Sequence, residues 1–275
     1  MRSRVPGLIC VIALILAACS GAATPDSSGP NSAPVVSAAP ANLTIYGAAS
    51  LKAVLAKVKT AYEAANPGTT LTISTDSSAS LEFQIEQGAP ADVFLSADTK
   101  NPQTLIDKGL AAGSLTKFAG NLLAIIVPTA NQAAIQTPAD LARSGVKVIA
   151  AGDAVPITKY ATQLVANLAK QPGYPPDFVA RYTANIVSKE DNVAAVVAKI
   201  GLGEGDAGIV YVTDSKAATG VTTFAVPDAA NVPATYGGVV VKPSTHLAAA
   251  TAFLAWFAGP RGQTILASFG FLPPS

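Results

Sequence analysis

The sequence predicts an α/β protein of two lobes, in which strands alternate with helices. An apolar strand at 43–46 runs through the small residues 47–49 into Ser50 and a helix whose apolar residues recur at helical spacing. The same order of strand, hydroxyl-rich turn and helix returns at 71–85. Repetition of this unit indicates sheets of mainly parallel strands, and the short helices favour two lobes over one continuous barrel.

The remaining elements follow from apolar runs and from the Gly and Pro residues that separate them. Further strands are expected at 91–96, 122–127, 146–150, 207–212, 221–226 and 236–241. Helices are expected from Ser50, from Ser78, at 102–108, 138–144, 160–168, 191–200 and 247–258, and finally up to 268. Ser50 stands where an N-cap belongs, and Pro138 takes the first position of a short helix that Gly145 closes.

Residues 1–18 have the pattern of a secretory signal peptide, in which arginines precede an apolar stretch at 8–16 and small residues follow. A cysteine directly after Leu-Ala-Ala resembles the bacterial lipobox, so we expect Cys19 to carry a lipid; a soluble secreted form is the alternative. Residues 19–42 are rich in Ser, Ala, Pro and Gly, which predicts a disordered linker. The protein is therefore expected outside the cytoplasm, lipid-anchored to a bacterial cell membrane.

The composition argues against several classes of function. Lys and Arg number 18 against 17 Asp and Glu, so the basic excess of a nucleic-acid-binding protein is missing. A single histidine, His246, cannot assemble an ordinary zinc or iron site, and we expect no protein-coordinated metal and no cofactor. A Ser-His-Asp hydrolase would need His246 and a Gly-x-Ser-x-Gly elbow, which the sequence lacks. We therefore expect no enzymatic activity.

Four turns place hydroxyls or free backbone N–H groups at the start of a helix. They are Ser50, Ser77-Ser78, Ile157-Thr158 and Asp191-Asn192. Helix starts of this kind bind anions through neutral dipoles, and no Lys or Arg adjoins the first two. Because no nucleophile or base accompanies them, the pattern indicates that an oxyanion is bound and not transformed.

Motifs along the chain resemble those of the substrate-binding proteins of molybdate ABC importers. The resemblance covers about residues 43 to 272, in the family's order. Its most specific run is Gln84-Ile85-Glu86-Gln87-Gly88-Ala89-Pro90-Ala91-Asp92-Val93-Phe94. The other motifs are Gly47-Ala48-Ala49-Ser50-Leu51, Ser77-Ser78-Ala79-Ser80-Leu81, Ser96-Ala97-Asp98, Gly152-Asp153-Ala154-Val155-Pro156, Glu190-Asp191, Gly208-Ile209-Val210-Tyr211, Gly259-Pro260 and Phe269-Gly270-Phe271.

This resemblance implies a two-lobed, periplasmic-binding-protein-like fold of type II, each lobe a mixed sheet flanked by helices. The chain would cross between the lobes in two hinge segments, which we place near Gly120 and Val226. Lobe I would then comprise 43–120 plus 227–275, and lobe II 121–226.

The resemblance also implies the ligand-binding residues, which are Ser50, Ser78, Ile157, Asn192 and Tyr211. Ser50 and Ser78 would supply hydroxyl and backbone N–H groups. Ile157 and Asn192 would supply backbone N–H groups, and Tyr211 its phenol O–H.

The function implied is capture of molybdate, and also tungstate, between the lobes and delivery by a monomeric protein to an ABC permease. A same-fold binder of sulfate, phosphate or a small carboxylate is the alternative, and a secreted serine hydrolase using Ser50 or Ser78 is a distant one. Two features depart from the family. Asp76 would place a negative charge near the dianion unless it points away, and the bulk of Ile157-Thr158 would reshape the pocket or add a hydroxyl ligand.

Overall fold

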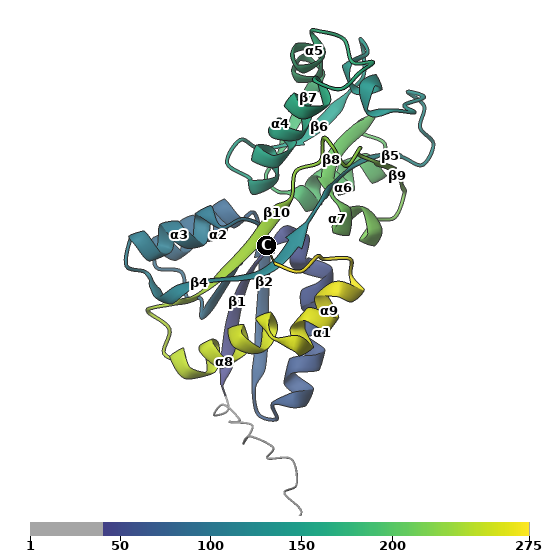
Figure 1. The fold of residues 1–275 in the computed structure, drawn as a ribbon. Coiled ribbons are helices and arrows are strands. Elements are labelled where there is room, and N and C mark those ends of the chain that lie inside the picture. Colours follow the sequence, from purple (N-terminus) through teal and green to yellow (C-terminus); the bar gives the residue numbers. More distant parts are fainter. Residues whose placement is uncertain (1–40, 275) are drawn as a thin grey trace, which may run out of the picture. The chain divides into compact units, whose positions relative to one another are not determined.

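The computed structural model describes residues 41–274, in which the strands form two five-stranded sheets with helices packed against them (Figure 1). The predicted fold class, two lobes that each hold a mixed sheet flanked by helices, is confirmed. The predicted signal peptide, Cys19 and all but the last two residues of the predicted linker lie outside the described residues. Within residues 41–274, no helix is long and apolar enough to cross a membrane.

The first sheet has the strand order β2-β1-β3-β10-β4. Its first three strands are parallel, and β10 runs antiparallel to both of its neighbours. The strands are β1 (Asn42–Ala48), β2 (Thr70–Asp76), β3 (Val93–Ser96), β4 (Ala111–Asn121) and β10 (Ala234–Val241). The helices are η1 (Ala49–Leu51), α1 (Lys52–Ala65), α2 (Ser78–Glu86), α3 (Lys100–Asp107), α8 (Leu247–Ala258) and α9 (Pro260–Ser268).

The second sheet repeats this plan in the order β7-β6-β8-β5-β9. Strand β6 is parallel to β7 and β8, while β5 is antiparallel to β8 and β9. The strands are β5 (Leu123–Pro128), β6 (Val148–Ala151), β7 (Ile186–Glu190), β8 (Ala207–Tyr211) and β9 (Val221–Ala225). The helices are η2 (Pro138–Ala142), α4 (Pro156–Leu168), α5 (Phe178–Ala184), α6 (Val193–Gly201) and α7 (Val212–Ala217).

The helices bury apolar stripes on the two faces of the first sheet. On one face, α1 contributes Leu55 and Val58 and α8 contributes Phe253, all fully buried. On the other face, Leu81 of α2 and Leu105 of α3 pack in a separate apolar cluster. Burial of such side chains is the main stabilising contribution, roughly 1.5–3 kcal/mol for each, so both helix layers hold the sheet in place.

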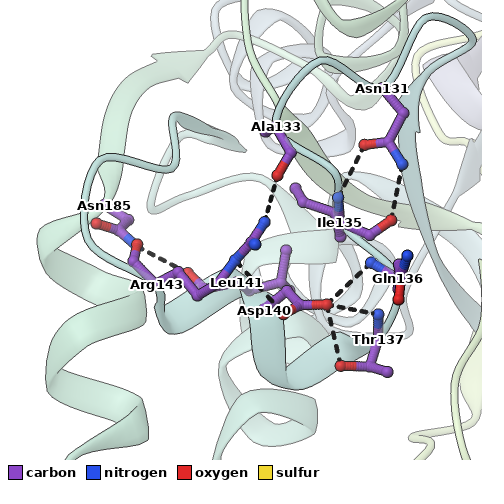
Figure 2. A network of polar contacts seen from close by, with 9 residues as sticks. All are labelled: Asn131, Ala133, Ile135, Gln136, Thr137, Asp140, Leu141, Arg143 and Asn185. Atoms are coloured by element: carbon purple, nitrogen blue, oxygen red, sulfur yellow. Dashed lines mark hydrogen bonds and ion pairs between the residues drawn. The ribbon is translucent and has the colours of Figure 1, made fainter.

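A network of polar contacts fixes the segment between β5 and β6, which has little regular structure (Figure 2). The Asp140 carboxylate accepts hydrogen bonds from the backbone N–H groups of Gln136 at 2.9 Å and Thr137 at 2.8 Å. The Asn131 side chain both donates to and accepts from the backbone of Ile135. The helix start predicted here is confirmed, although η2 is a short 3-10 helix and not an α-helix.

Several elements differ from the sequence-based expectation. Strand β1 begins at Asn42, inside the predicted linker, and runs on to Ala48, so residues 47 and 48 are strand and not turn. Ser50 lies within η1 and makes no capping hydrogen bond, so the predicted N-cap is wrong. Four elements were not expected from the sequence: β4, α5, β7 and α7. Strand β4 escapes the pattern because its first seven residues are partly exposed and carry no apolar run.

The parallel strands of each sheet end close together and lead into helix starts. In the first sheet Ala48 of β1 pairs with Asp76 of β2, and both strands end there. In the second sheet Ala151 of β6 pairs in the same way with Glu190 of β7. Turns that follow the carboxyl ends of parallel strands gather at one edge of a sheet, which is where α/β proteins bind ligands.

Candidate anion-binding site

The five residues predicted to bind the ligand all line one small cavity. The cavity lies where η1 and α2 of the first lobe face α4, α6 and β8 of the second. The predicted residues are Ser50, Ser78, Ile157, Asn192 and Tyr211, and the other lining residues are Ala48, Ala49, Ser77, Ala97, Val155, Pro156 and Val193. About 10 Å³ is open to the centre of a water-sized sphere, which is room for roughly one water molecule.

The starts of several helices converge on this cavity. Ser78 is the first residue of α2, Pro156 the first of α4 and Val193 the first of α6. The first backbone N–H groups of a helix have no partner within the helix and carry its positive dipole end. No Lys, Arg or His lines the cavity among the described residues, so its attraction for an anion comes from neutral dipoles.

The two serine hydroxyls already have one protein partner each. Ser78 Oγ accepts a hydrogen bond from the backbone N–H of Ala97 at 3.0 Å. Ser50 Oγ lies 2.9 Å from the Tyr236 hydroxyl, and both residues are buried. A serine oxygen that accepts from the protein still has its own hydrogen to donate, so Ser78 retains a donor for a ligand in the cavity.

Tyr211 brings a buried hydroxyl to the cavity from the end of β8. The residue is 1% exposed, and no described residue hydrogen-bonds its Oη. Burial raises the pKa of the Tyr211 phenol well above its ordinary value, so the group keeps its proton and remains a donor. Because leaving such a group unpaired is costly, its unpaired state next to the cavity points to a ligand as its partner.

Two lining residues of this cavity, Ser77 and Val193, lie in or beside predicted anion-binding turns but were not among the five predicted ligand-binding residues. Ser77 Oγ is buried and lacks a hydrogen-bond partner in the described part of the chain. Val193 is the first residue of α6 and lines the cavity beside Asn192, which is the N-cap. The signal available was the N-cap itself, since the residue after an Asn N-cap carries the free N–H.

Asn192 uses its side chain to cap α6 and to reach the first lobe. Its Oδ1 accepts from the backbone N–H of Ala195 at 3.1 Å, and its Nδ2 donates to Asp76 Oδ1 at 2.9 Å. The same Asp76 oxygen accepts from the backbone N–H of Ser77 at 2.7 Å. The Asp76 carboxylate therefore accepts from two protein donors, and Asp76 does not line the cavity.

Ile157 and Thr158 take different positions at the start of α4. Ile157 is buried and lines the cavity as the second residue of the helix. The Thr158 hydroxyl donates to the carbonyl oxygens of Gly152 at 2.7 Å and Ala151 at 3.1 Å. With its hydrogen engaged there, Thr158 adds no hydroxyl donor to the cavity.

The side chains that metal and hydrolase sites require are not grouped at this cavity in the part of the chain that the structure describes. No group of three or more His, Cys, Asp and Glu side chains able to hold a metal ion occurs within residues 41–274. His246 precedes α8 and lines a different surface pocket, which neither Ser50 nor Ser78 reaches. The arrangement at the cavity can hold an acceptor-rich ligand, but it presents no nucleophile–base pair.

Comparison with known proteins sets the class: residues 43–272 match the model of the bacterial extracellular solute-binding protein family. Molybdate-binding protein ModA of Mycobacterium tuberculosis is 34% identical over 234 residues, 85% of this chain and 85% of that protein. The periplasmic molybdate-binding protein of Azotobacter vinelandii superposes with a TM-score of 0.72 and 25% identity, over 85% of this chain and 100% of that one.

The sulfate-binding protein SubI of Mycobacterium tuberculosis shares the fold, with a TM-score of 0.74 and 22% identity over 84% of this chain and 86% of that one. Together with the cavity, these matches assign the chain to the ModA family of bacterial extracellular solute-binding proteins. It is a solute-binding protein and not an enzyme.

Proposed function

We propose that this protein captures molybdate, and also tungstate, in the cavity between its lobes and delivers it to an ABC permease. The observation that carries the proposal is the unpaired Tyr211 hydroxyl, buried beside a cavity where helix starts converge. Neutral hydroxyl and N–H donors, with no positively charged side chain among them, suit an anion whose oxygens only accept hydrogen bonds. The relatives named for molybdate binding make this oxyanion the first choice.

The residues divide the binding task by type of donor. Ser50 and Ser78 offer hydroxyls from the first lobe, and Tyr211 offers its phenol from the second. Ile157 and Asn192 offer backbone N–H groups. We add the backbone N–H of Val193, because Val193 is the first residue of α6 after the Asn192 N-cap. Contacts from both lobes mean that the anion favours the closed arrangement over the open one.

Closure is a hinge motion about the two segments in which the chain crosses between the lobes. We place them near Gly120 and Val226, so that lobe I comprises 43–120 plus 227–275 and lobe II 121–226. Sheet membership supports this division, since β4 and β5 belong to different sheets, as do β9 and β10. A tetrahedral oxyanion is larger than the space of about one water molecule, so the lobes must separate to admit it.

The mature protein is held at the membrane by a lipid on Cys19, and the predicted linker of residues 19–42 acts as the tether up to Ala41, since Asn42 already belongs to β1. This part of the proposal is supported by the sequence pattern of residues 1–42 alone. A tether of this composition lets the folded lobes reach a permease in the same membrane.

Isothermal titration with molybdate, tungstate and sulfate tests the proposal. We expect one-to-one binding of molybdate and tungstate and no binding of sulfate. The hydrogen-bond donors of the site do not distinguish these dianions, so the size of the cavity must select among them. Ser78→Ala should weaken molybdate binding about 10- to 150-fold, the value of one hydrogen bond to a charged ligand. Ser80→Ala, two residues along the same helix and away from the cavity, is the control and should bind normally. Tight binding of sulfate alone would instead establish the same-fold alternative.

A further inference from the structure

A chain of buried polar groups lies behind Ser50. Ser50 Oγ is 2.9 Å from Tyr236 Oη, which lies 3.3 Å from Asn121 Nδ2. The same Asn121 nitrogen donates to Thr213 Oγ1 at 2.8 Å. All four residues are buried, and Asn121 and Tyr236 are both 0% exposed. We call Ser50, Tyr236, Asn121 and Thr213 the hydroxyl network.

The orientation of the Asn121 amide sets the direction of the hydrogen bonds in this network. The backbone N–H of Leu122 donates to Asn121 Oδ1 at 3.0 Å, which identifies the opposite end of the amide as the NH₂ group. An amide NH₂ can only donate. The Tyr236 oxygen and the Thr213 oxygen are therefore both acceptors from Asn121.

The Tyr236 hydroxyl then has one available hydrogen-bond acceptor among the described residues. Burial raises the pKa of the Tyr236 phenol well above its ordinary value, so the hydroxyl keeps its proton. Among the described residues, Ser50 Oγ is the acceptor within hydrogen-bond distance of that hydroxyl. Since an unmade buried hydrogen bond is costly, Tyr236 donates to Ser50. The Ser50 hydrogen must then turn away from Tyr236, and Ser50 lines the cavity.

We propose that Asn121 and Tyr236 are positioning residues that fix the Ser50 hydroxyl as a hydrogen-bond donor toward the bound anion. The inference rests on the proposed function, because it assumes an anion in contact with Ser50. It also adds a source of specificity. A hydroxyl that is fixed as a donor offers no acceptor to a ligand O–H group, whose hydrogen would face the hydroxyl hydrogen. The site therefore disfavours protonated oxyanions such as hydrogenphosphate in addition to selecting by size.

Ser78 provides an internal comparison. Its Oγ accepts from the backbone N–H of Ala97 at 3.0 Å, so its hydrogen is also left for the ligand. This arrangement involves neither Tyr236 nor Asn121. The two serines therefore reach the same donor state by independent routes, and a double-mutant cycle can separate them.

The test measures molybdate affinity by titration calorimetry for Tyr236→Phe in three backgrounds of the full-length protein: wild type, Ser50→Ala and Ser78→Ala. In wild type and in Ser78→Ala we expect Tyr236→Phe to weaken binding about 3- to 10-fold, the value of one neutral hydrogen bond. In Ser50→Ala, where no hydroxyl is left to orient, it should change affinity less than about twofold. Tyr62→Phe, which removes the hydroxyl of a tyrosine buried in the core of the first lobe, should leave affinity unchanged.

A second variant tests the direction of the network. Asn121→Asp replaces the NH₂ donor with an acceptor, which draws the Tyr236 proton to residue 121 and lets Ser50 donate to Tyr236. It should weaken molybdate binding more than Tyr236→Phe does. If Asn121→Asp fails to fold, the Tyr236 cycle still decides.

The outcomes separate the two proposals. Equal weakening by Tyr236→Phe with and without the Ser50 hydroxyl, or no weakening at all, overturns the positioning role while molybdate binding by wild type stands. Failure of the wild-type protein to bind molybdate would sink the proposed function itself.

Discussion

Replacing Tyr211 with Phe should stabilise the ligand-free protein while it weakens anion binding. The Tyr211 hydroxyl is buried and has no hydrogen-bond partner among the described residues. Removing an unsatisfied buried hydroxyl recovers its desolvation cost, about 1–3 kcal/mol. For a chain of this size each kcal/mol raises Tm by roughly 2–4 °C, so the gain is measurable by calorimetry without ligand.

The same substitution removes a donor to the bound dianion. A hydrogen bond to a charged group is worth about 1.5–3 kcal/mol, which corresponds to a roughly 10- to 150-fold loss of molybdate affinity. The rise in Tm produced by a fixed molybdate concentration should shrink accordingly, because ligand stabilisation follows the ratio of concentration to Kd. Opposite effects on stability and affinity are the signature of a group kept for its ligand.

Two measurements on Tyr211→Phe test these opposite effects: thermal unfolding without ligand and titration with molybdate. Tyr62→Phe is the control, since the Tyr62 ring packs edge-on against Phe253 and Trp256 away from the cavity. It should leave molybdate affinity unchanged. A Tyr211→Phe protein that is less stable than wild type and binds molybdate as tightly would refute the reasoning.

Three further predictions concern other contacts. Asp76→Ala removes the acceptor of Asn192 Nδ2 and should speed molybdate release several-fold in stopped-flow experiments. Asp76→Asn keeps an acceptor oxygen and should release molybdate at the wild-type rate. If Asp76→Ala also released molybdate at the wild-type rate, this contact between the lobes would not hold them closed. Burial raises the pKa of Asp214 from 3.8 to about 7, so the native state retains a proton that the unfolded state loses, and stability falls as pH rises from about 4 to about 7. The loss of stability over this range is at most about 4 kcal/mol, and less because Asp214 is partly exposed. Asp214→Asn should flatten this part of the curve of unfolding free energy against pH. Gly262→Ala would bring a Cβ to 1.9 Å from the Phe257 carbonyl oxygen and should destabilise by about 1–3 kcal/mol or more, measured by urea unfolding.

The sequence predicted the strand-to-helix turns at this site better than the elements around it. Repetition of strand, hydroxyl-rich turn and helix located Ser50 and Ser78, and the structure brings both to one cavity with Tyr211. Local spacing suffices there because each turn directly follows a short strand and leads into a helix. Strand β4 was missed because its pairing with β10, more than 100 residues away, depends on tertiary context.

The hydrogen-bond partners of the site residues lay beyond the reach of the sequence. Ser50 looked like an N-cap, yet its hydroxyl contacts Tyr236, 186 positions later in the chain. The sequence left open whether Asp76 faces the ligand or points away, and in the structure it accepts from Ser77 and Asn192. A side chain with several local options is decided by which distant element packs beside it, and that information is not contained in local spacing.

The position of β10 has a consequence for the order in which the lobes are completed. Strand β10 lies between β3 and β4 in the first sheet, although it follows every strand of the second sheet in the chain. When the chain is synthesised from its N-terminus, the second sheet can assemble once residue 225 has been made. The first sheet still lacks its inner strand β10 until residue 241 has been made. During that interval β3 and β4 each present an unpaired edge, which is the kind of surface that invites wrong pairing between chains. The first lobe, which begins the chain, is thus the last to be finished.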